Sequence, residues 1–252
     1  MDYETPSAFA KRIVDEAVAN AFKNGVKAGK KNVGTKTVIM SFLYKDGIMI
    51  AADRQVTGGY KIVRKNFPKI FRASAFSAVS FCGTVSMAQI VAKIFKNVLA
   101  STKFRIGEEM PVRGQIRELE ELMQTLGLYM GEIGVELHFA GLDIKTGRPH
   151  LLEIFEDGCV LRPDSPFIAD GSGGIEAKTK LTDYFKTRNP REMEFDEAMR
   201  LALQTIQMCA ESDAGVGDPR LQGATLATIT MKDGFSFVDE ATVNKFIAEV
   251  CK

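Results

Sequence analysis

The chain has 252 residues, 45% of them hydrophobic, and 33 Lys and Arg against 32 Asp and Glu. This is the composition of a globular protein with one substantial core, and its balanced charge gives no argument for binding nucleic acid or an anionic membrane. No stretch reaches the roughly 18 apolar residues that cross a bilayer, and the N-terminus lacks the apolar core of a signal peptide. We therefore expect a cytoplasmic protein with no membrane or nucleic-acid partner.

The first part of the chain has the pattern of an amphipathic helix. Apolar residues recur at three-to-four spacing between Phe9 and Val26, and glycines and lysines follow up to Gly34. Such a glycine-rich, basic stretch is typical of a flexible connection. We expect residues 1–36 to form a separable, leader-like segment and residues 37–252 to form one domain.

From residue 37 onward, alternating apolar residues and turn signals indicate β structure, interrupted twice by helical segments with one apolar stripe. The expected elements in chain order are strands 37–44, 48–52, 61–63, 70–73 and 78–82, helices 86–100 and 113–130, strands 135–143, 149–155 and 159–162, helices 174–187 and 195–211, strands 224–231 and 235–238, and a short terminal helix. Two sheets between two helical layers would bury both apolar sheet faces. We therefore expect an α+β fold, a four-layer αββα sandwich.

Cysteine and histidine spacing predicts neither disulfides nor a metal site. The four cysteines lie far apart without a CxxC pair: Cys82, Cys159, Cys209 and Cys251. His138 and His150 fall in strand-like runs without HxH or HExxH spacing. A reducing compartment is the simpler interpretation, and no metal is expected.

Residues 37–57 form a predicted hairpin that ends in Ala-Ala-Asp53 and continues through a turn to Thr57. This stretch resembles the opening of proteasome β subunits and their bacterial relatives. The resemblance continues in order through Asn-Phe-Pro-Lys69, Phe-Cys-Gly83, Asp-Gly-Ser172 and Ser-Asp213, and it covers about residues 35–245. It implies the sandwich fold of the N-terminal nucleophile hydrolases.

The resemblance also assigns roles to individual residues. In the family the nucleophilic threonine lies sixteen residues before the aspartate and the lysine sixteen residues after it. Thr37, Asp53 and Lys69 have this spacing, so the resemblance makes Thr37 the nucleophile. In N-terminal hydrolases the base is the nucleophile's own α-amine, which titrates near about 8. Lys69 would lower the pKa values of the amine and hydroxyl, and Asp53 would hold that lysine in place.

Thr35 is an alternative nucleophile. It follows Gly34 directly, and the family often matures at a Gly–Thr bond. Choosing Thr35 requires a two-residue insertion in a tight hairpin, where alternation decides which face each side chain meets. Thr37 is therefore favoured.

Further roles come from the same resemblance. Ser172 and Asp213 would support the amine through hydrogen bonds, and the Gly83 N–H would stabilise the oxyanion. Apolar residues, beside Thr57, would surround the side chain before the scissile bond: Val56, Phe67, Phe71, Phe81 and Val85. Because an unpaired charge is poorly solvated in such a pocket, cleavage after apolar residues is expected.

Two positions depart from the family pattern. Gln55 stands where many β subunits have arginine, although some bacterial relatives carry glutamine there. Val216 takes a place usually held by Ser or Thr, which removes one hydrogen bond near the amine.

The function that the resemblance implies is a threonine endopeptidase, made as a zymogen, that works in a homo-oligomeric barrel on unfolded proteins. It would self-assemble into rings, work with an α-type ring and an ATPase unfoldase, and need no cofactor. Two alternatives stay open. One is a non-catalytic, α-type-like structural or gating subunit, and the other is a transpeptidase or ligase on the same fold.

Overall fold

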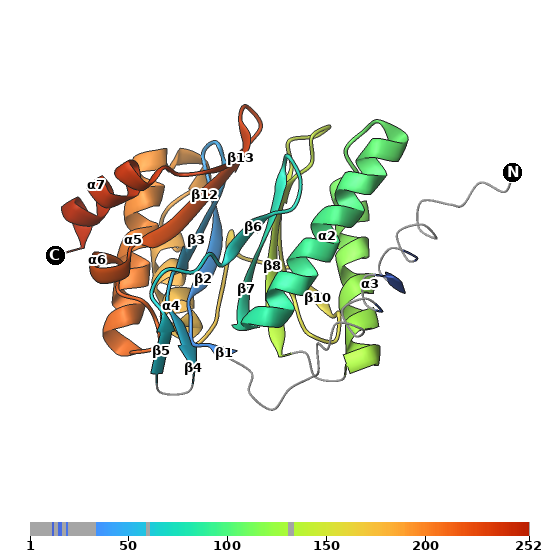
Figure 1. Ribbon diagram of the computed structural model, residues 1–252. Coiled ribbons are helices and arrows are strands. Elements are labelled where there is room, and N and C mark those ends of the chain that lie inside the picture. Colours follow the sequence, from blue (N-terminus) through green and yellow to red (C-terminus); the bar gives the residue numbers. More distant parts are fainter. Residues whose placement is uncertain are drawn as a thin grey trace, which may run out of the picture.

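The computed structural model describes residues 12, 15, 16, 19, 34–58, 61–130 and 134–251. Arg12, Asp15, Glu16 and Ala19 are helical, and the rest of the expected leading helix between Phe9 and Val26 lies outside the described residues. Most of the described chain forms two antiparallel sheets flanked by helices (Figure 1).

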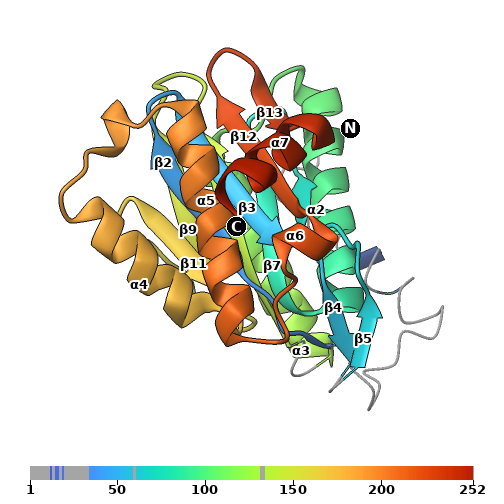
Figure 2. The same cartoon turned by 90° about the vertical axis from the view of Figure 1, so that its left-hand side faces the viewer.

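The first sheet contains the expected hairpin. Its strands, in spatial order, are β11 (Phe167–Asp170), β2 (Ile39–Tyr44), β3 (Gly47–Asp53), β12 (Ala224–Thr230) and β13 (Gly234–Phe237). Helices α4 (Gly174–Phe185) and α5 (Phe195–Ser212) cover its outer face, as Figure 2 shows from that side. The short η1 (Pro190–Glu192) and α6 (Pro219–Gln222) and the terminal α7 (Glu240–Val250) complete this half.

The second sheet has β7 (Ser77–Thr84) near one edge. Its strands lie in the spatial order β1 (Gly34–Thr35), β7, β8 (Val135–Leu142), β9 (Pro149–Ile154) and β10 (Val160–Leu161). Strand β6 (Ile70–Arg72) also pairs with β7. Helices α2 (Val85–Ile106) and α3 (Val112–Met130) pack against it on the side away from the first sheet (Figure 1). A separate ribbon joins β4 (Val56–Gly58) to β5 (Lys61–Arg64).

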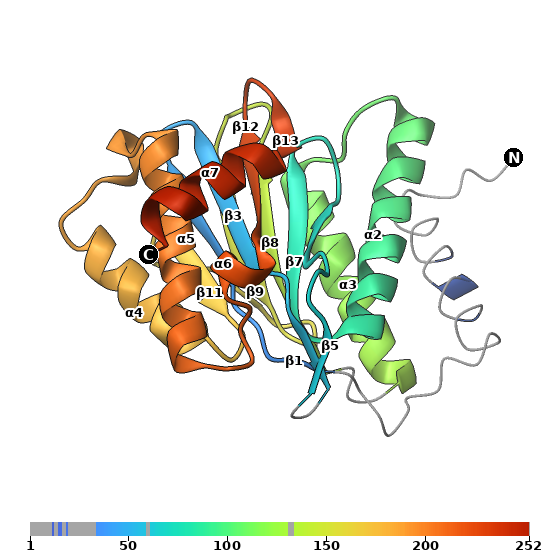
Figure 3. The same cartoon turned by 60° about the vertical axis from the view of Figure 1, so that its left-hand side comes forward.

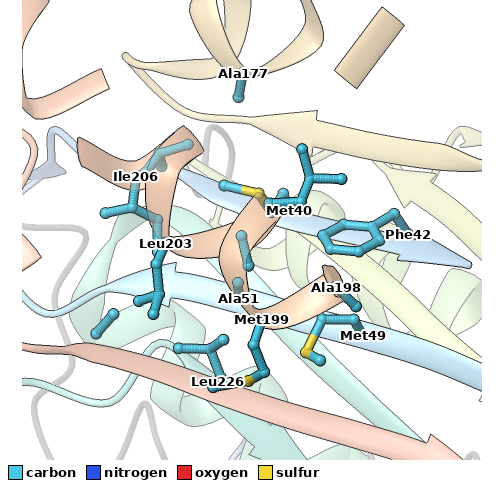
Figure 4. Close-up of a cluster of buried hydrophobic side chains, with 14 of the residues drawn as sticks. Met40, Phe42, Met49, Ala51, Ala177, Ala198, Met199, Leu203, Ile206 and Leu226 are labelled. Atoms are coloured by element: carbon cyan, nitrogen blue, oxygen red, sulfur yellow. The ribbon is translucent and has the colours of Figure 1, made fainter. Parts of the chain in front are cut away.

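Strand β3 explains why the two sheets stack. Ile48, Ile50 and Ala52 belong to the cluster between the sheets, whereas Met49 and Ala51 belong to the cluster under α5. Successive strand residues point to opposite faces, so a strand covered on both sides is apolar throughout. Figure 4 shows the outer cluster, where Met199 and Leu203 of α5 lie beside these side chains.

The expected α+β class is confirmed, and the structure adds three strands that the sequence pattern did not predict. These are β1, β4 and β11, none longer than four residues. Among the described residues, no helix combines the length and apolar character needed to cross a membrane. All four cysteines are free.

Candidate active site

Five of the predicted site residues meet where strands and helices end. Thr37 precedes β2, Asp53 ends β3 and Lys69 precedes β6. Ser172 lies between β11 and α4, and Asp213 follows α5. Residues far apart in the sequence come together here because β2 pairs with both β3 and β11.

Asp53 is the centre of the hydrogen-bond network. Its fully buried carboxylate accepts hydrogen bonds from the Thr37 hydroxyl at 2.6 Å and the Lys69 ammonium at 2.7 Å. Backbone N–H groups of Val38, Gln55 and Gly217 donate to it at 2.9–3.0 Å. A buried charge is stable only when it is paired and hydrogen-bonded, and five donors meet that condition.

Lys69 joins Asp53 to Thr37. Its Nζ donates to the Thr37 Oγ1 as well as to Asp53, and the side chain is fully buried. Burial lowers the pKa of Lys69, and the Asp53 carboxylate opposes that shift. A cation therefore lies directly against the threonine hydroxyl, where it favours loss of the hydroxyl proton.

The backbone nitrogen of Thr37 has its own partners. It donates to Ser172 Oγ at 3.0 Å. Partial burial would raise the pKa of Asp213, but hydrogen bonds from Ser172 and the Gly215 N–H, with Lys36 nearby, lower it overall. The nitrogen of Thr37 is thus linked through Ser172 to an ionised carboxylate.

Gly83 lies beside the segment that precedes Thr37. Strand β1 lies near one end of β7 (Figure 3), and Thr35 and Gly83 are antiparallel partners there. The Lys36 N–H donates to Thr57 Oγ1 at 3.2 Å. Gly83 has φ 98°, and a Cβ there would lie 2.2 Å from the Gly134 carbonyl oxygen. Only glycine fits this backbone without a clash.

The sequence did not predict the residues that fix the loops around the site. The Gln55 side-chain amide donates to the carbonyls of Ala214 and Gly215 at 3.0 and 3.1 Å. It thereby fixes the loop whose Gly217 N–H binds Asp53. A Cβ on Gly171 would lie 2.3 Å from the Thr37 carbonyl oxygen, so glycine is required there as well. Val216 is buried in the apolar cluster under α5.

The expected substrate-binding residues separate into two groups. Val56, Phe67 and Val85 line a pocket of about 430 Å³, together with four residues that were not expected: Val63, Arg64, Ser86 and Gln89. Phe71 and Phe81 do not line this pocket. Phe81 is 1% exposed, stacks on Phe71 with ring centroids 5.7 Å apart, and meets Phe67 edge-on.

The two histidines have different surroundings. His150 Nδ1 lies 3.3 Å from an Arg162 nitrogen. His138 is buried in β8, and burial lowers its pKa to about 4, more than the nearby Asp170 raises it. Its imidazole is therefore neutral at neutral pH.

The arrangement can activate a hydroxyl for attack on a carbonyl carbon. Thr37 supplies the hydroxyl, Lys69 and Asp53 contact it, and the pocket provides a place for a substrate side chain. In the full-length chain the Thr37 nitrogen is an amide, which is no base.

Comparisons with known proteins agree on one family. The model of the proteasome subunit family matches residues 31–219. The chain is 28% identical over 232 residues to proteasome subunit beta 1 of Streptomyces avermitilis, covering 90% of this chain and 80% of the relative. It is 26% identical over 217 residues to proteasome subunit beta of Methanobrevibacter smithii, covering 86% and 97%.

Proposed function

Because this chain belongs to the proteasome family as a β-type subunit, we propose that it is a threonine-type endopeptidase that degrades unfolded proteins inside a ring-shaped barrel. Copies of the chain would form the rings, with an α-type ring and an ATPase unfoldase as further partners. Helices on the outer faces of two stacked sheets support the four-layer αββα sandwich of the N-terminal nucleophile hydrolases.

The observation that carries the proposal is the contact of the Thr37 hydroxyl with both Lys69 and Asp53. Asp53 keeps the buried ammonium charged, and the ammonium stabilises the alkoxide that forms as the proton leaves. Thr35 takes part in this region through its backbone pairing with Gly83. The contacts therefore favour Thr37 over Thr35 as the nucleophile.

The proposed reaction begins once the Lys36–Thr37 bond is cut. The freed amine of Thr37 takes the hydroxyl proton, and Oγ1 attacks the substrate carbonyl carbon. The Gly83 N–H would stabilise the resulting oxyanion. The scissile C–N bond then breaks, the leaving amine takes the proton, and water hydrolyses the threonine ester.

Residues 1–36 would act as a leader that keeps the subunit inactive. The last residues of this segment run between Thr57 and Gly83, where a substrate strand would lie. Cleavage before Thr37 would release the amine beside Ser172 and clear that strand edge in one event.

The experiment is an intact-mass measurement of the assembled particle, combined with peptide hydrolysis by Thr37→Ala and Thr37→Ser. We expect a mass beginning at Thr37, no hydrolysis by the alanine variant and partial activity of the serine variant, which keeps a hydroxyl. A mass beginning at Thr35, or normal hydrolysis by Thr37→Ala, would reject this nucleophile. A chain that stays whole in native particles would indicate a non-catalytic subunit, and joined peptides would indicate a transpeptidase.

A further inference from the structure

A second group of ionisable side chains lies between the two sheets. Cys82 faces Glu136 across β7 and β8, and His138 faces Glu153 across β8 and β9. Asp170, the last residue of β11, reaches the same place from the other sheet. Cross-strand neighbours have Cβ atoms about 4.5–5.5 Å apart, so the register brings each of the first two pairs together.

His138 is the unusual member of this group. It is 1% exposed, and neither ring nitrogen has a hydrogen-bond partner. Buried polar atoms in native proteins are almost always paired, because an unpaired one costs about 1–3 kcal/mol. A buried imidazole with two unsatisfied nitrogens therefore indicates a missing partner.

The neighbours of His138 are suited to a metal ion. One ligand atom each from His138, Glu153 and Asp170 lies within 4.8 Å of the other two. Ligands that bind one zinc ion at about 2.1 Å are at most about 4.2 Å apart, so small side-chain shifts would close the site. Two carboxylates and one imidazole are a common donor set for a divalent transition metal.

We propose that His138, Glu153 and Asp170 bind a divalent transition-metal ion of the zinc class between the two sheets. Glu153 and Asp170 are only partly buried, which leaves a route for the ion. Lys178 forms an ion pair with Glu153 at 3.2 Å, and this lysine is half exposed and can turn to solvent.

Cys82 and Glu136 form a competing triad with Asp170. The Cys82 thiol already donates to Glu136 Oε2 at 3.8 Å, so this triad has an internal partner that His138 lacks. The unsatisfied imidazole is what distinguishes the chosen set, and Cys82 is left out of the coordination.

The ion would act on the candidate active site through Asp170. The carboxylate of Asp170 accepts the Gly171 N–H at 2.6 Å, and the next residue is Ser172, which contacts the Thr37 nitrogen. A metal bound to Asp170 would therefore fix the position of the turn from Asp170 to Ser172. The metal site itself does not depend on the proposed peptidase activity.

This inference departs from the sequence-based expectation of no metal. Metal-binding motifs are recognised by ligands close together in the chain. Here the register of β8 and β9 brings His138 beside Glu153, and the stacking of the two sheets brings Asp170 to them.

The test uses the full chain, stripped of metal with a chelator and titrated with Zn²⁺ alone, with zinc content measured after desalting. We expect about one retained zinc per chain and a higher melting temperature. His138→Leu and Asp170→Asn should each weaken zinc binding by roughly tenfold or more. His150→Leu, which changes the other histidine of the chain, and Cys82→Ala should bind zinc like the parent protein.

Two results would overturn the proposal. One is a parent chain that retains no zinc after desalting. The other is equal binding by the parent and Asp170→Asn, which would place the ion on surface residues. If His138→Leu fails to fold, the parent stoichiometry and Asp170→Asn still decide the question.

Discussion

The buried pair of Lys69 and Asp53 should respond unequally to loss of its two members. In Asp53→Asn the ammonium stays fully buried without its carboxylate, which costs about 3–5 kcal/mol of unfolding free energy. The new amide oxygen can keep the Gln55 and Gly217 donors, but this turns its NH2 group toward Lys69.

The opposite change should be milder. In Lys69→Met the Asp53 carboxylate retains four donors, so the loss is one charged hydrogen bond, about 1.5–3 kcal/mol. The double variant removes both charges and should be at least about 1 kcal/mol more stable than Asp53→Asn alone.

Denaturant unfolding followed by circular dichroism, at one chain concentration and with masses checked, measures these differences. In Asp53→Asn the pKa of Lys69 should fall further, because its carboxylate is gone. A base whose folded pKa is depressed loses stability as pH falls below its unfolded value, so Asp53→Asn should gain stability relative to the double variant as pH rises toward the ordinary pKa of lysine. If Lys69→Met is the more damaging change, or the double variant is no more stable than Asp53→Asn, the charge argument is wrong.

Three further predictions use other parts of the structure. Gly83→Ala should lower the unfolding free energy by about 1–3 kcal/mol, since its Cβ would collide with the Gly134 carbonyl; thermal melts at or above the parent value would contradict this. Burial, and then Glu121, raise the pKa of Glu118 to about 7, so this carboxyl stabilises the fold below about pH 4.5 and loses that contribution as pH rises through 7. Glu118→Gln should therefore be more stable than the parent by about 1 kcal/mol at pH 8, after allowance for its partial exposure, with no gain at pH 4. Peptides with Leu or Tyr before the scissile bond should be cleaved faster than those with Glu, and those with Arg least, because Arg64 lines the pocket; equal turnover of the Arg peptide would reject the pocket assignment.

Much of the fold could be predicted because periodicity is a local property. The hairpin of β2 and β3 has an apolar run with a clear turn, and both appear as expected. Strands β4 and β11, of three and four residues, were not predicted. They are defined by their pairing with other strands, β4 with β5 and β11 with β2.

The candidate site, too, could be predicted only in part from the sequence. Thr37, Asp53 and Lys69 could be proposed because their order and spacing match those of the family that the sequence resembles. The Gly217 N–H that donates to Asp53 comes from a loop 164 residues away in the chain. No local sequence pattern predicts this contact. Phe81 was expected in the pocket because the family resemblance aligns it there, and an alignment cannot show that its ring is 1% exposed and packs in the core cluster under α2.

Strand β3, with both faces buried and partners on both edges, should be among the last segments to exchange its amide hydrogens with solvent. Asp53 is the final residue of this strand, so the carboxylate beside the Thr37 hydroxyl belongs to the most protected part of the molecule. Its position is then set when the chain folds, and substrate binding has no need to assemble it. Any lasting displacement of that carboxylate would require opening the whole domain.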